Sequence, residues 1–157
     1  MNIGMVAPVA DATIAGIRRL VLVLPEPPSL NAMLDLAKQR TRRSRTGGWM
    51  KRSLPVVYDQ ELEVYEMRCL AALRGLGVSA PATPWPRWRL EAAEFRLHRL
   101  RDPIELLASL KWPVDVLVRL GFVAGDSPRE LLETPRPTQL IDPKNRRVTL
   151  TIASLTS

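Results

Sequence analysis

Three stretches of the chain place apolar side chains at the spacing of regular secondary structure. Residues 18–25 are rich in aliphatic side chains and end at a proline, which predicts a strand. Residues 59–76 repeat apolar side chains at steps of three and four, which predicts an amphipathic helix. Residues 87–99 roughly alternate apolar and polar positions and predict a second strand, with a bulge at 92–93 where the alternation changes phase. The pattern therefore indicates a chain that mixes strands and helices.

The clearest helix signal covers residues 103–120. Asp102 is suited to cap its first turn, a proline occupies the first helical position, and Glu105 completes a capping pattern. Pro113 lies inside this segment and lacks the backbone N–H that would bond to Ser109. We therefore expect a helix that begins sharply and kinks near its middle.

The C-terminal part, 138–152, predicts a β-hairpin, because Asp-Pro-Lys-Asn at 142–145 is typical of a tight turn. The expected architecture is a single α+β domain over 18–157, in which a small mixed sheet packs with helices. Residues 1–17 are expected to form a flexible N-terminal tail. The strands of the sheet are expected near 18–25, 87–99, 137–141 and 146–153.

Composition agrees with one globular domain and narrows its chemistry. The 157 residues include one cysteine, Cys69, and one histidine, His98, which excludes an intrachain disulfide and a thiolate zinc site and speaks against a Ser-His-Asp triad. The single cysteine suits a reducing cytosol, so we expect a cytoplasmic protein. No apolar run reaches about 18 residues, so we expect no membrane span. The net charge of +7 suggests a polyanionic partner, most simply nucleic acid.

Carboxylates, lysines and arginines are the reactive side chains that remain, and they gather in one stretch. Asp102 and Asp126 lie on either side of the predicted helix 103–120. Hard carboxylate oxygens with a nearby lysine suit Mg²⁺-dependent phosphodiester chemistry. Helix capping and ordinary four-residue ion pairs explain the same residues without a metal, so spacing alone leaves both interpretations open. The helix arc that carries these groups consists of Glu105, Lys111, Asp115 and Arg119.

Four segments of the sequence, in the order in which they occur, together resemble a known pattern. Residues 24–31 read Leu-Pro-Glu-Pro-Pro-Ser-Leu-Asn, and 101–122 begin Arg-Asp-Pro-Ile-Glu-Leu-Leu before a helix with a lysine and an aspartate. Residues 125–131 begin Gly-Asp-Ser-Pro, and 146–152 read Arg-Arg-Val-Thr-Leu-Thr-Ile. These segments resemble the first strand and proline corner, the Asp-x-Asp-Asn motif with its helix, the Asp-Asp turn and the last strand of RusA-type Holliday-junction resolvases, including their phage and prophage branch. The resemblance covers roughly residues 18–153.

The resemblance implies a RusA-like fold and an endodeoxyribonuclease that uses Mg²⁺, with Mn²⁺ as a substitute. By position, Asp102 matches the family's first metal-binding Asp, Lys111 its catalytic Lys, and Asp126 its last acidic ligand. Ile104 stands where the family has its second Asp, and Glu105 occupies the adjacent Asn position as a candidate third metal ligand. Asp115, on the same helix, would orient Lys111. The expected catalytic set is Asp102, Glu105, Lys111, Asp115 and Asp126.

Resolving a four-way junction takes two symmetric cuts, so the resemblance also implies a homodimer that binds branched DNA. A basic loop or arm over 40–52 is expected to contact DNA phosphates, with Trp49 stacking at an opened junction centre. Two arginines beside the first metal-binding Asp are expected to contact the phosphate near the site. The expected DNA-binding residues are Arg40, Arg42, Arg43, Arg45, Trp49, Lys51, Arg52, Arg99 and Arg101.

Two other functions remain open at this point. The isoleucine at 104 removes a carboxylate that the family uses, which favours a catalytically inactive relative that binds branched DNA without cutting it. A basic protein-interaction or RNA-binding domain, with the 40–52 segment as its working part, is the third interpretation.

Overall fold

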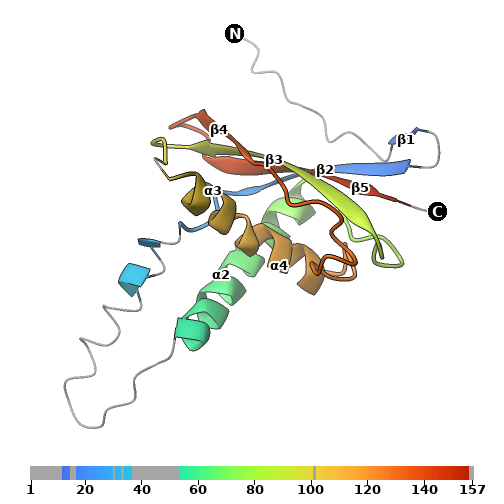
Figure 1. Cartoon of the computed structure of the whole chain (residues 1–157), viewed down its shortest axis with the longest axis horizontal. Coiled ribbons are helices and arrows are strands. Elements are labelled where there is room, and N and C mark those ends of the chain that lie inside the picture. Colours follow the sequence, from blue (N-terminus) through green and yellow to red (C-terminus); the bar gives the residue numbers. More distant parts are fainter. Residues whose placement is uncertain are drawn as a thin grey trace.

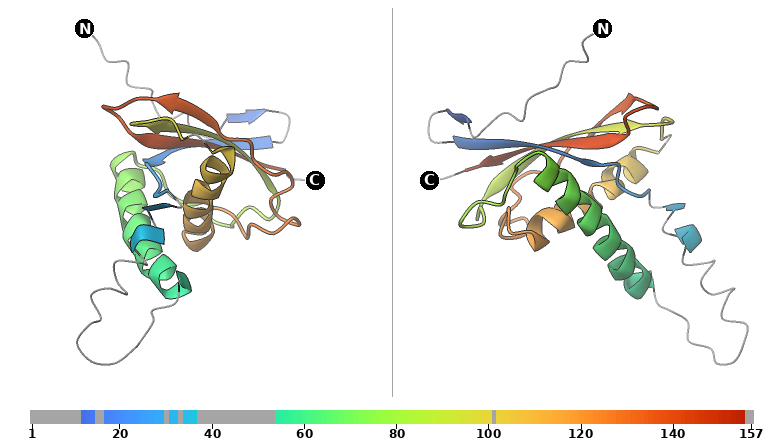
Figure 2. Two further views of the ribbon diagram at one scale, coloured as in Figure 1. Left: turned by 60° about the vertical axis from the view of Figure 1, so that its left-hand side comes forward. Right: turned by 180° about the vertical axis from the view of Figure 1, so that it is seen from behind.

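The computed structural model describes residues 12–14, 17–29, 31–32, 34–36, 54–100 and 102–155. These residues form a five-stranded sheet with the strand order β1-β2-β5-β3-β4. The described long helices lie on one face of this sheet (Figures 1 and 2). The elements are β1 (Ala12–Ile14), β2 (Ile17–Pro25), α2 (Leu54–Gly75), β3 (Trp88–Arg96), α3 (Pro103–Ser109), α4 (Lys111–Arg119), β4 (Thr138–Ile141) and β5 (Arg147–Ser154).

The sheet is mixed, as the sequence predicts. Strand β5 lies between β2 and β3 and is antiparallel to both, whereas β4 is parallel to β3. Helices α3 and α4 connect β3 to β4, which is the crossover that two adjacent parallel strands require. The chain is therefore a single α+β domain, and this part of the prediction is confirmed.

The predicted C-terminal hairpin is wrong, although its turn exists. Asn145 donates its backbone N–H to the Asp142 carbonyl at 3.3 Å, which closes a turn over 142–145. The strands on either side of the turn do not pair with each other, because β3 lies between β4 and β5. The residue types at 142–145 predict the turn correctly. Which strands pair depends on the crossover from β3, which no local sequence pattern encodes.

The predicted bulge at 92–93 is also wrong. The register of β3 against β5 runs without interruption through Ala92↔Leu150 and Ala93↔Thr149. The apolar pattern changes phase because Glu94 and Arg96 occupy inward positions of the strand, where both are buried. A buried ion pair thus imitated a change of phase in the sequence pattern.

The predicted helix 103–120 is split into α3 and α4 at Leu110. Pro113 explains the break, because it has no N–H to donate to the Ser109 carbonyl. The ladder restarts when Val114 donates its N–H to the Leu110 carbonyl at 3.1 Å. The expected interruption is present, as a division into two helices. The other long helix begins at Leu54 rather than at 59, so α2 is longer than predicted.

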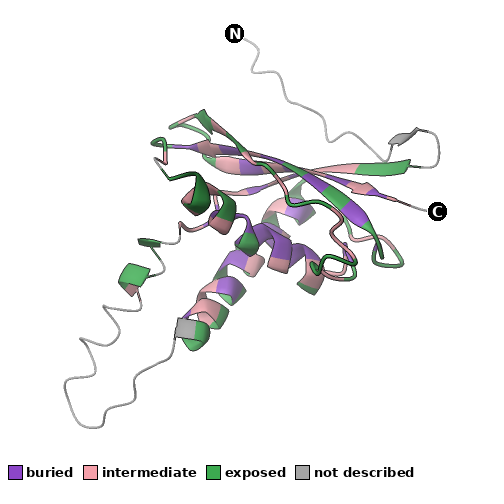
Figure 3. Cartoon of the chain, viewed as in Figure 1, coloured by how far each residue is buried: buried purple, intermediate pink, exposed green. Residues whose placement is uncertain are grey.

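Alternation along the strands directs apolar side chains toward the helices and builds the core there. Leu22 and Leu24 of β2 and Leu150 and Ile152 of β5 are buried on the same face. Against them pack the inward faces of α2 and α4 (Figure 3). The buried helix residues include Leu62, Tyr65, Cys69, Trp112 and Leu117. The core therefore lies in the layer between sheet and helices.

The expectation of a flexible tail over 1–17 is wrong for residues 12–14 and Ile17, which belong to strands. Within that segment, residues 12–14 form β1, which pairs antiparallel with β2. The remainder of the expected tail up to residue 11, together with residues 15–16, lies outside the described residues, and so does the whole basic segment 40–52.

Candidate functional site: the helix pair α3–α4 and its loops

Asp102 is the N-cap of α3. Its Oδ1 accepts a hydrogen bond from the Ile104 N–H at 2.8 Å, and Pro103 occupies the first turn. This carboxylate satisfies a donor that the helix cannot satisfy internally. The capping interpretation of the sequence is thus confirmed for Asp102, whose side chain is exposed at the surface.

The two positions that depart from the family motif lie in the first turn of α3. The Ile104 side chain is 72% exposed, so it fills no part of the core. Glu105 accepts a hydrogen bond from Asn31 Nδ2 at 3.1 Å, a residue that follows β2 in the chain. Glu105 therefore joins α3 to the proline corner of the predicted first motif.

Asp115 is the centre of a charged cluster on α4. Its Oδ1 forms an ion pair with Lys111 Nζ at 3.1 Å, and its Oδ2 accepts a hydrogen bond from the Tyr58 hydroxyl. The Lys111 ammonium also lies 5.8 Å from the centre of the Tyr58 ring. The Asp115 side chain is only 17% exposed, whereas Lys111 is 59% exposed. The cluster thus fixes a carboxylate inside and presents an ammonium outside.

Tyr58 reaches this cluster from the first turns of α2. Its ring packs against Trp112 with a centroid separation of 4.6 Å, which anchors it on α4. Burial raises the pKa of the Tyr58 phenol far above its usual value, and the hydrogen bond to Asp115 raises it further. The phenol consequently stays protonated and acts as a donor.

Asp126 lies in the loop after α4. The negative charges of Asp115, Asp59 and Asp126 all raise the pKa of Tyr58, so these carboxylates lie within electrostatic range of its hydroxyl. Trp88 Nε1 donates to the Gly125 carbonyl at 2.8 Å and thereby ties the loop to β3. Asp126 therefore lies within electrostatic range of the Tyr58 hydroxyl, which donates to Asp115.

A buried charge pair lies beneath the junction of the two helices. Arg96 Nε donates to Glu94 Oε2 at 2.6 Å, and the Ser109 hydroxyl donates to Glu94 Oε1. Burial raises the pKa of Glu94, and the Ser109 hydrogen bond and the Arg96 charge oppose this rise. Arg96 also faces Glu26 at 3.4 Å. This network joins the end of β3 to the end of α3 and thereby positions α3.

The three expected metal ligands do not come together as a metal-binding group in the described part of the chain. Among the residues that the structure describes, no group of three or more His, Cys, Asp or Glu side chains lies close enough to hold a metal ion. The three expected ligands, Asp102, Glu105 and Asp126, all belong to the described part of the chain. The first caps α3 and the second binds Asn31. The described residues therefore do not fit the protein-bound Mg²⁺ that the resemblance implies.

The expected DNA contacts lie mostly beyond the described residues. Arg99 is exposed in the connection between β3 and α3. Arg101 and the seven expected contacts between 40 and 52 fall outside the described residues.

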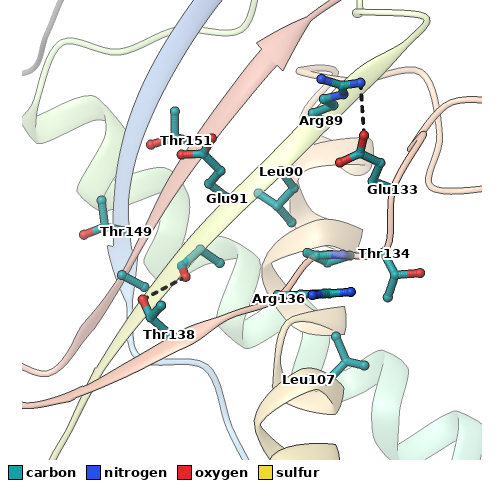
Figure 4. Close-up of a pocket in the computed structure, with 13 residues that line it drawn as sticks. Arg89, Leu90, Glu91, Leu107, Glu133, Thr134, Arg136, Thr138, Thr149 and Thr151 are labelled. Carbon is teal, nitrogen blue, oxygen red and sulfur yellow. Dashed lines mark hydrogen bonds and ion pairs between the residues drawn. The ribbon is translucent and has the colours of Figure 1, made fainter.

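A cavity of about 1120 Å³ lies between the edge of β3 and the connection to β4 (Figure 4). Arg89 and Glu133, which form an ion pair at 3.0 Å, close one end of it, and Arg136 points into it. Leu107 of α3 lies at the opposite end. The expected catalytic residues are not among the described residues that line it. The cavity is therefore separate from the Lys111–Asp115 cluster.

No protein-family model matches the chain, and no curated protein matches it. The likeness to RusA-type resolvases rests on the motifs of the sequence. Among the described residues, no helix has both the length and the apolar character needed to cross a membrane.

Tyr58 is the residue that the sequence prediction missed. The predicted helix began at 59, immediately after it. A signal was present, because Tyr58 precedes Tyr65 by two helical turns and continues the apolar stripe that includes Cys69. Extending the periodicity backwards identifies the inner face of α2, although it does not reveal the partner Asp115.

Proposed function

We propose that the chain is a RusA-like protein that binds branched DNA as a homodimer without metal-dependent cleavage. Of the functions that the sequence leaves open, this one depends least on groups that are missing among the described residues. It draws on the net positive charge of the chain and on the exposed lysine, and it requires no metal.

The observation that carries the proposal is Ile104. The family motif that this chain resembles has a carboxylate there, whereas Ile104 is apolar and 72% exposed beside the N-cap of α3. Asp102 is engaged in capping, and the described residues contain no three-carboxylate group. A hard divalent cation needs several oxygen ligands, so loss of one carboxylate and engagement of another weaken binding of the metal.

Electrostatics supports binding of a polyanion. Each chain carries a formal charge of +7, so a dimer carries twice that charge. The Lys111 side chain is exposed, and its ion pair with Asp115 fixes the position of its ammonium, which suits a phosphate contact. Removing a three-carboxylate cluster also removes a source of repulsion toward DNA, so binding should not require a divalent cation.

The second candidate is the endonuclease itself, with Lys111 stabilising charge that develops on the scissile phosphate. The ion pair between Lys111 and Asp115, with Asp126 in electrostatic range of the neighbouring Tyr58 hydroxyl, favours it. It requires Mg²⁺ or Mn²⁺, for which the described residues form no binding group. We therefore rank it below the binding function.

Restoring the missing carboxylate tests the proposal. The substitution Ile104→Asp is compared with Leu107→Asp, which adds a carboxylate to the same helix at a partly exposed position outside the motif. Both variants and the wild type are incubated with a labelled four-way junction and with EDTA, Mg²⁺ or Mn²⁺. The proposal predicts that all three proteins bind the junction in EDTA. It also predicts that the wild type and Leu107→Asp leave the DNA intact.

The outcomes separate the two candidates. Paired, metal-dependent nicks made by the wild type contradict the binding function and establish the endonuclease. New cleavage by Ile104→Asp alone supports an intact site that has lost one ligand. Equal affinity of the wild type for the junction, linear DNA duplex and RNA duplex contradicts both candidates and favours a general basic nucleic-acid-binding domain.

A further inference from the structure

The cavity of Figure 4 lies at a gap in the backbone pairing along the edge of β3 that faces away from β5. Trp88, at the start of β3, forms a parallel bridge with Leu131 of the connection from α4 to β4. Farther along β3, Ala93 pairs with Thr138 of β4. The connection between these two paired points is longer than the stretch of β3 opposite it. It therefore bulges away from the strand, and the edge of β3 stays open between the two points.

Three backbone groups of β3 face this gap. Trp88 directs its N–H and its C=O toward the connection, because it donates to the Glu130 carbonyl at 2.9 Å and accepts from the Leu132 N–H at 3.2 Å. The direction of backbone groups alternates along a strand, so Leu90 and Ala92 direct theirs to the same edge. The part of the chain that the structure describes gives no hydrogen-bond partner to the Leu90 N–H, the Leu90 C=O or the Ala92 N–H.

These unpaired groups belong to a buried part of the strand. Leu90 is 6% exposed and Ala92 is 7% exposed, and both residues line the cavity. Backbone polar groups at buried positions almost always have a hydrogen-bond partner, because an unpaired group loses its hydration without compensation. A molecule that enters the cavity can supply the missing partners.

The arrangement of these groups favours a compact ring. The Leu90 C=O and the Ala92 N–H are neighbours on the edge and offer an acceptor beside a donor. A nucleobase carries a donor beside an acceptor on its Watson–Crick edge, so one base can bond to both groups. A peptide added as a strand would have to run along the edge, but backbone pairing closes the gap at Trp88 and at Ala93.

The charges of the cavity favour an anion beside that ring. Two acids line the cavity, and each forms an ion pair with an arginine: Glu133 with Arg89 at 3.0 Å, and Glu91 with Arg19 at 3.4 Å. Arg136 points into the cavity (Figure 4), and no acid of the described chain forms an ion pair with it. Its guanidinium therefore has donors available for a phosphate, to which arginine binds through two parallel hydrogen bonds.

The size and the walls of the cavity suit a nucleotide. Its volume of about 1120 Å³ is large enough for a small ligand of this kind. Leu90, Leu107 and Pro135 supply apolar lining, against which the faces of a planar ring can pack.

We propose that this cavity binds one nucleotide, whose base pairs with the edge of β3 at Leu90 and Ala92 and whose phosphate is bound by Arg136. The nucleotide is either a free mononucleotide or an unpaired nucleotide of a DNA strand, since both present the same base and phosphate. The Lys111–Asp115 cluster does not line this cavity, so the proposal requires neither junction binding nor cleavage.

Backbone amide signals in nuclear magnetic resonance test the site directly. The full chain, labelled with ¹⁵N, is titrated in EDTA with each of the mononucleotides AMP, GMP, CMP and UMP, with adenosine, and with inorganic phosphate. The proposal predicts saturable shifts of the Leu90 and Ala92 amide signals with at least one mononucleotide and none with phosphate alone. If no mononucleotide shifts these two signals, the proposal is wrong. Saturable shifts with acetyl-tetraalanine amide, and with no nucleotide, overturn it in favour of an added peptide strand.

A pair of arginine variants tests the phosphate contact. Arg136→Gln is compared with Arg129→Gln, which changes an exposed arginine of the same connection that does not line the cavity. Arg136→Gln should weaken mononucleotide binding about tenfold or more, as for loss of a charge-assisted hydrogen bond, and leave the affinity for adenosine unchanged. Arg129→Gln should change neither affinity. Equal weakening by the two variants, or an equal loss of adenosine binding in Arg136→Gln, overturns the assignment of Arg136.

Competition identifies the source of the nucleotide. A single-stranded DNA oligomer is added to the protein that is saturated with the mononucleotide. Displacement of the mononucleotide supports the site and shows that a DNA strand supplies the ligand. Retention of the mononucleotide supports the site and shows that the ligand is free in solution. Loss of junction binding by the wild type would contradict the proposed function and would leave this site standing.

Discussion

The Tyr58 hydroxyl lies where α2 and α4 share one carboxylate. It donates to Asp115 Oδ2 while Lys111 engages Oδ1, so both oxygens of a nearly buried carboxylate have a partner. A buried charge that loses such a partner is costly, because solvent cannot replace it. Tyr58 thus links the packing of two helices to the position of the exposed ammonium.

A double-mutant cycle measures this link. Tyr58→Phe removes the donor and keeps the ring on Trp112, whereas Asp115→Asn removes the charge. We expect Tyr58→Phe to lower the free energy of unfolding by about 1–3 kcal/mol, as for a hydrogen bond to a charged acceptor. The coupling between the two substitutions should be on the order of 1 kcal/mol in urea denaturation. Additive effects would contradict a direct interaction in solution.

At the scale of single residues, the prediction from sequence fails where polar groups occupy inward positions. The sequence predicted strand β3 within a few residues, and it placed Cys69 correctly in the core. It failed at Glu94 and Arg96, because a pattern of apolar and polar residues treats every charged position as exposed. It failed at Tyr58 for a related reason, since hydrogen bonds between α2 and α4 leave no trace in local spacing.

At the scale of elements, the α3–α4 pair shows how one residue can satisfy two interpretations. Asp102, Pro103 and Glu105 predicted a helix start, and the structure has one there. The resemblance assigned Asp102 to a metal. The side chain accepts from the Ile104 N–H, so its energetic role in the isolated chain is to start α3.

Two substitutions separate these roles of Asp102. Asp102→Ala removes the capping oxygen and should lower the free energy of unfolding by about 1 kcal/mol. Asp102→Asn keeps a capping oxygen and should leave stability within about 0.5 kcal/mol of the wild type. Urea denaturation in EDTA gives both values. A loss of stability in Asp102→Asn equal to that in Asp102→Ala would show that the carboxylate charge, not the cap, is what α3 needs.

Element order was predictable from the sequence, but strand pairing was not. The turn over 142–145 and both strands around it were located from local residue types. Their separation by β3 follows from the α3–α4 crossover, which places β4 parallel to β3 at the edge. Likewise, the motif locates the acids of the candidate site, whereas their contacts with the Ile104 N–H, Asn31 and Tyr58 depend on the fold.

At the scale of the whole molecule, the proposed binding of DNA depends on net charge and on two-fold symmetry. The described long helices cover one face of the sheet (Figures 2 and 3). The proposed dimer joins two chains that each carry +7. Phosphate contacts release counterions, so the affinity for DNA should fall steeply as salt rises.

The central claim is that the chain binds branched DNA selectively without metal and leaves it uncut. The most direct measurement compares the dissociation constants of the wild type for a four-way junction and for a linear duplex of the same sequence, first in EDTA and then in Mg²⁺, with the recovered DNA examined on a denaturing gel. We predict a dissociation constant at least about tenfold lower for the junction, the same preference in both solutions, and intact strands. Equal affinity for both DNAs, or paired nicks in Mg²⁺, would contradict the account.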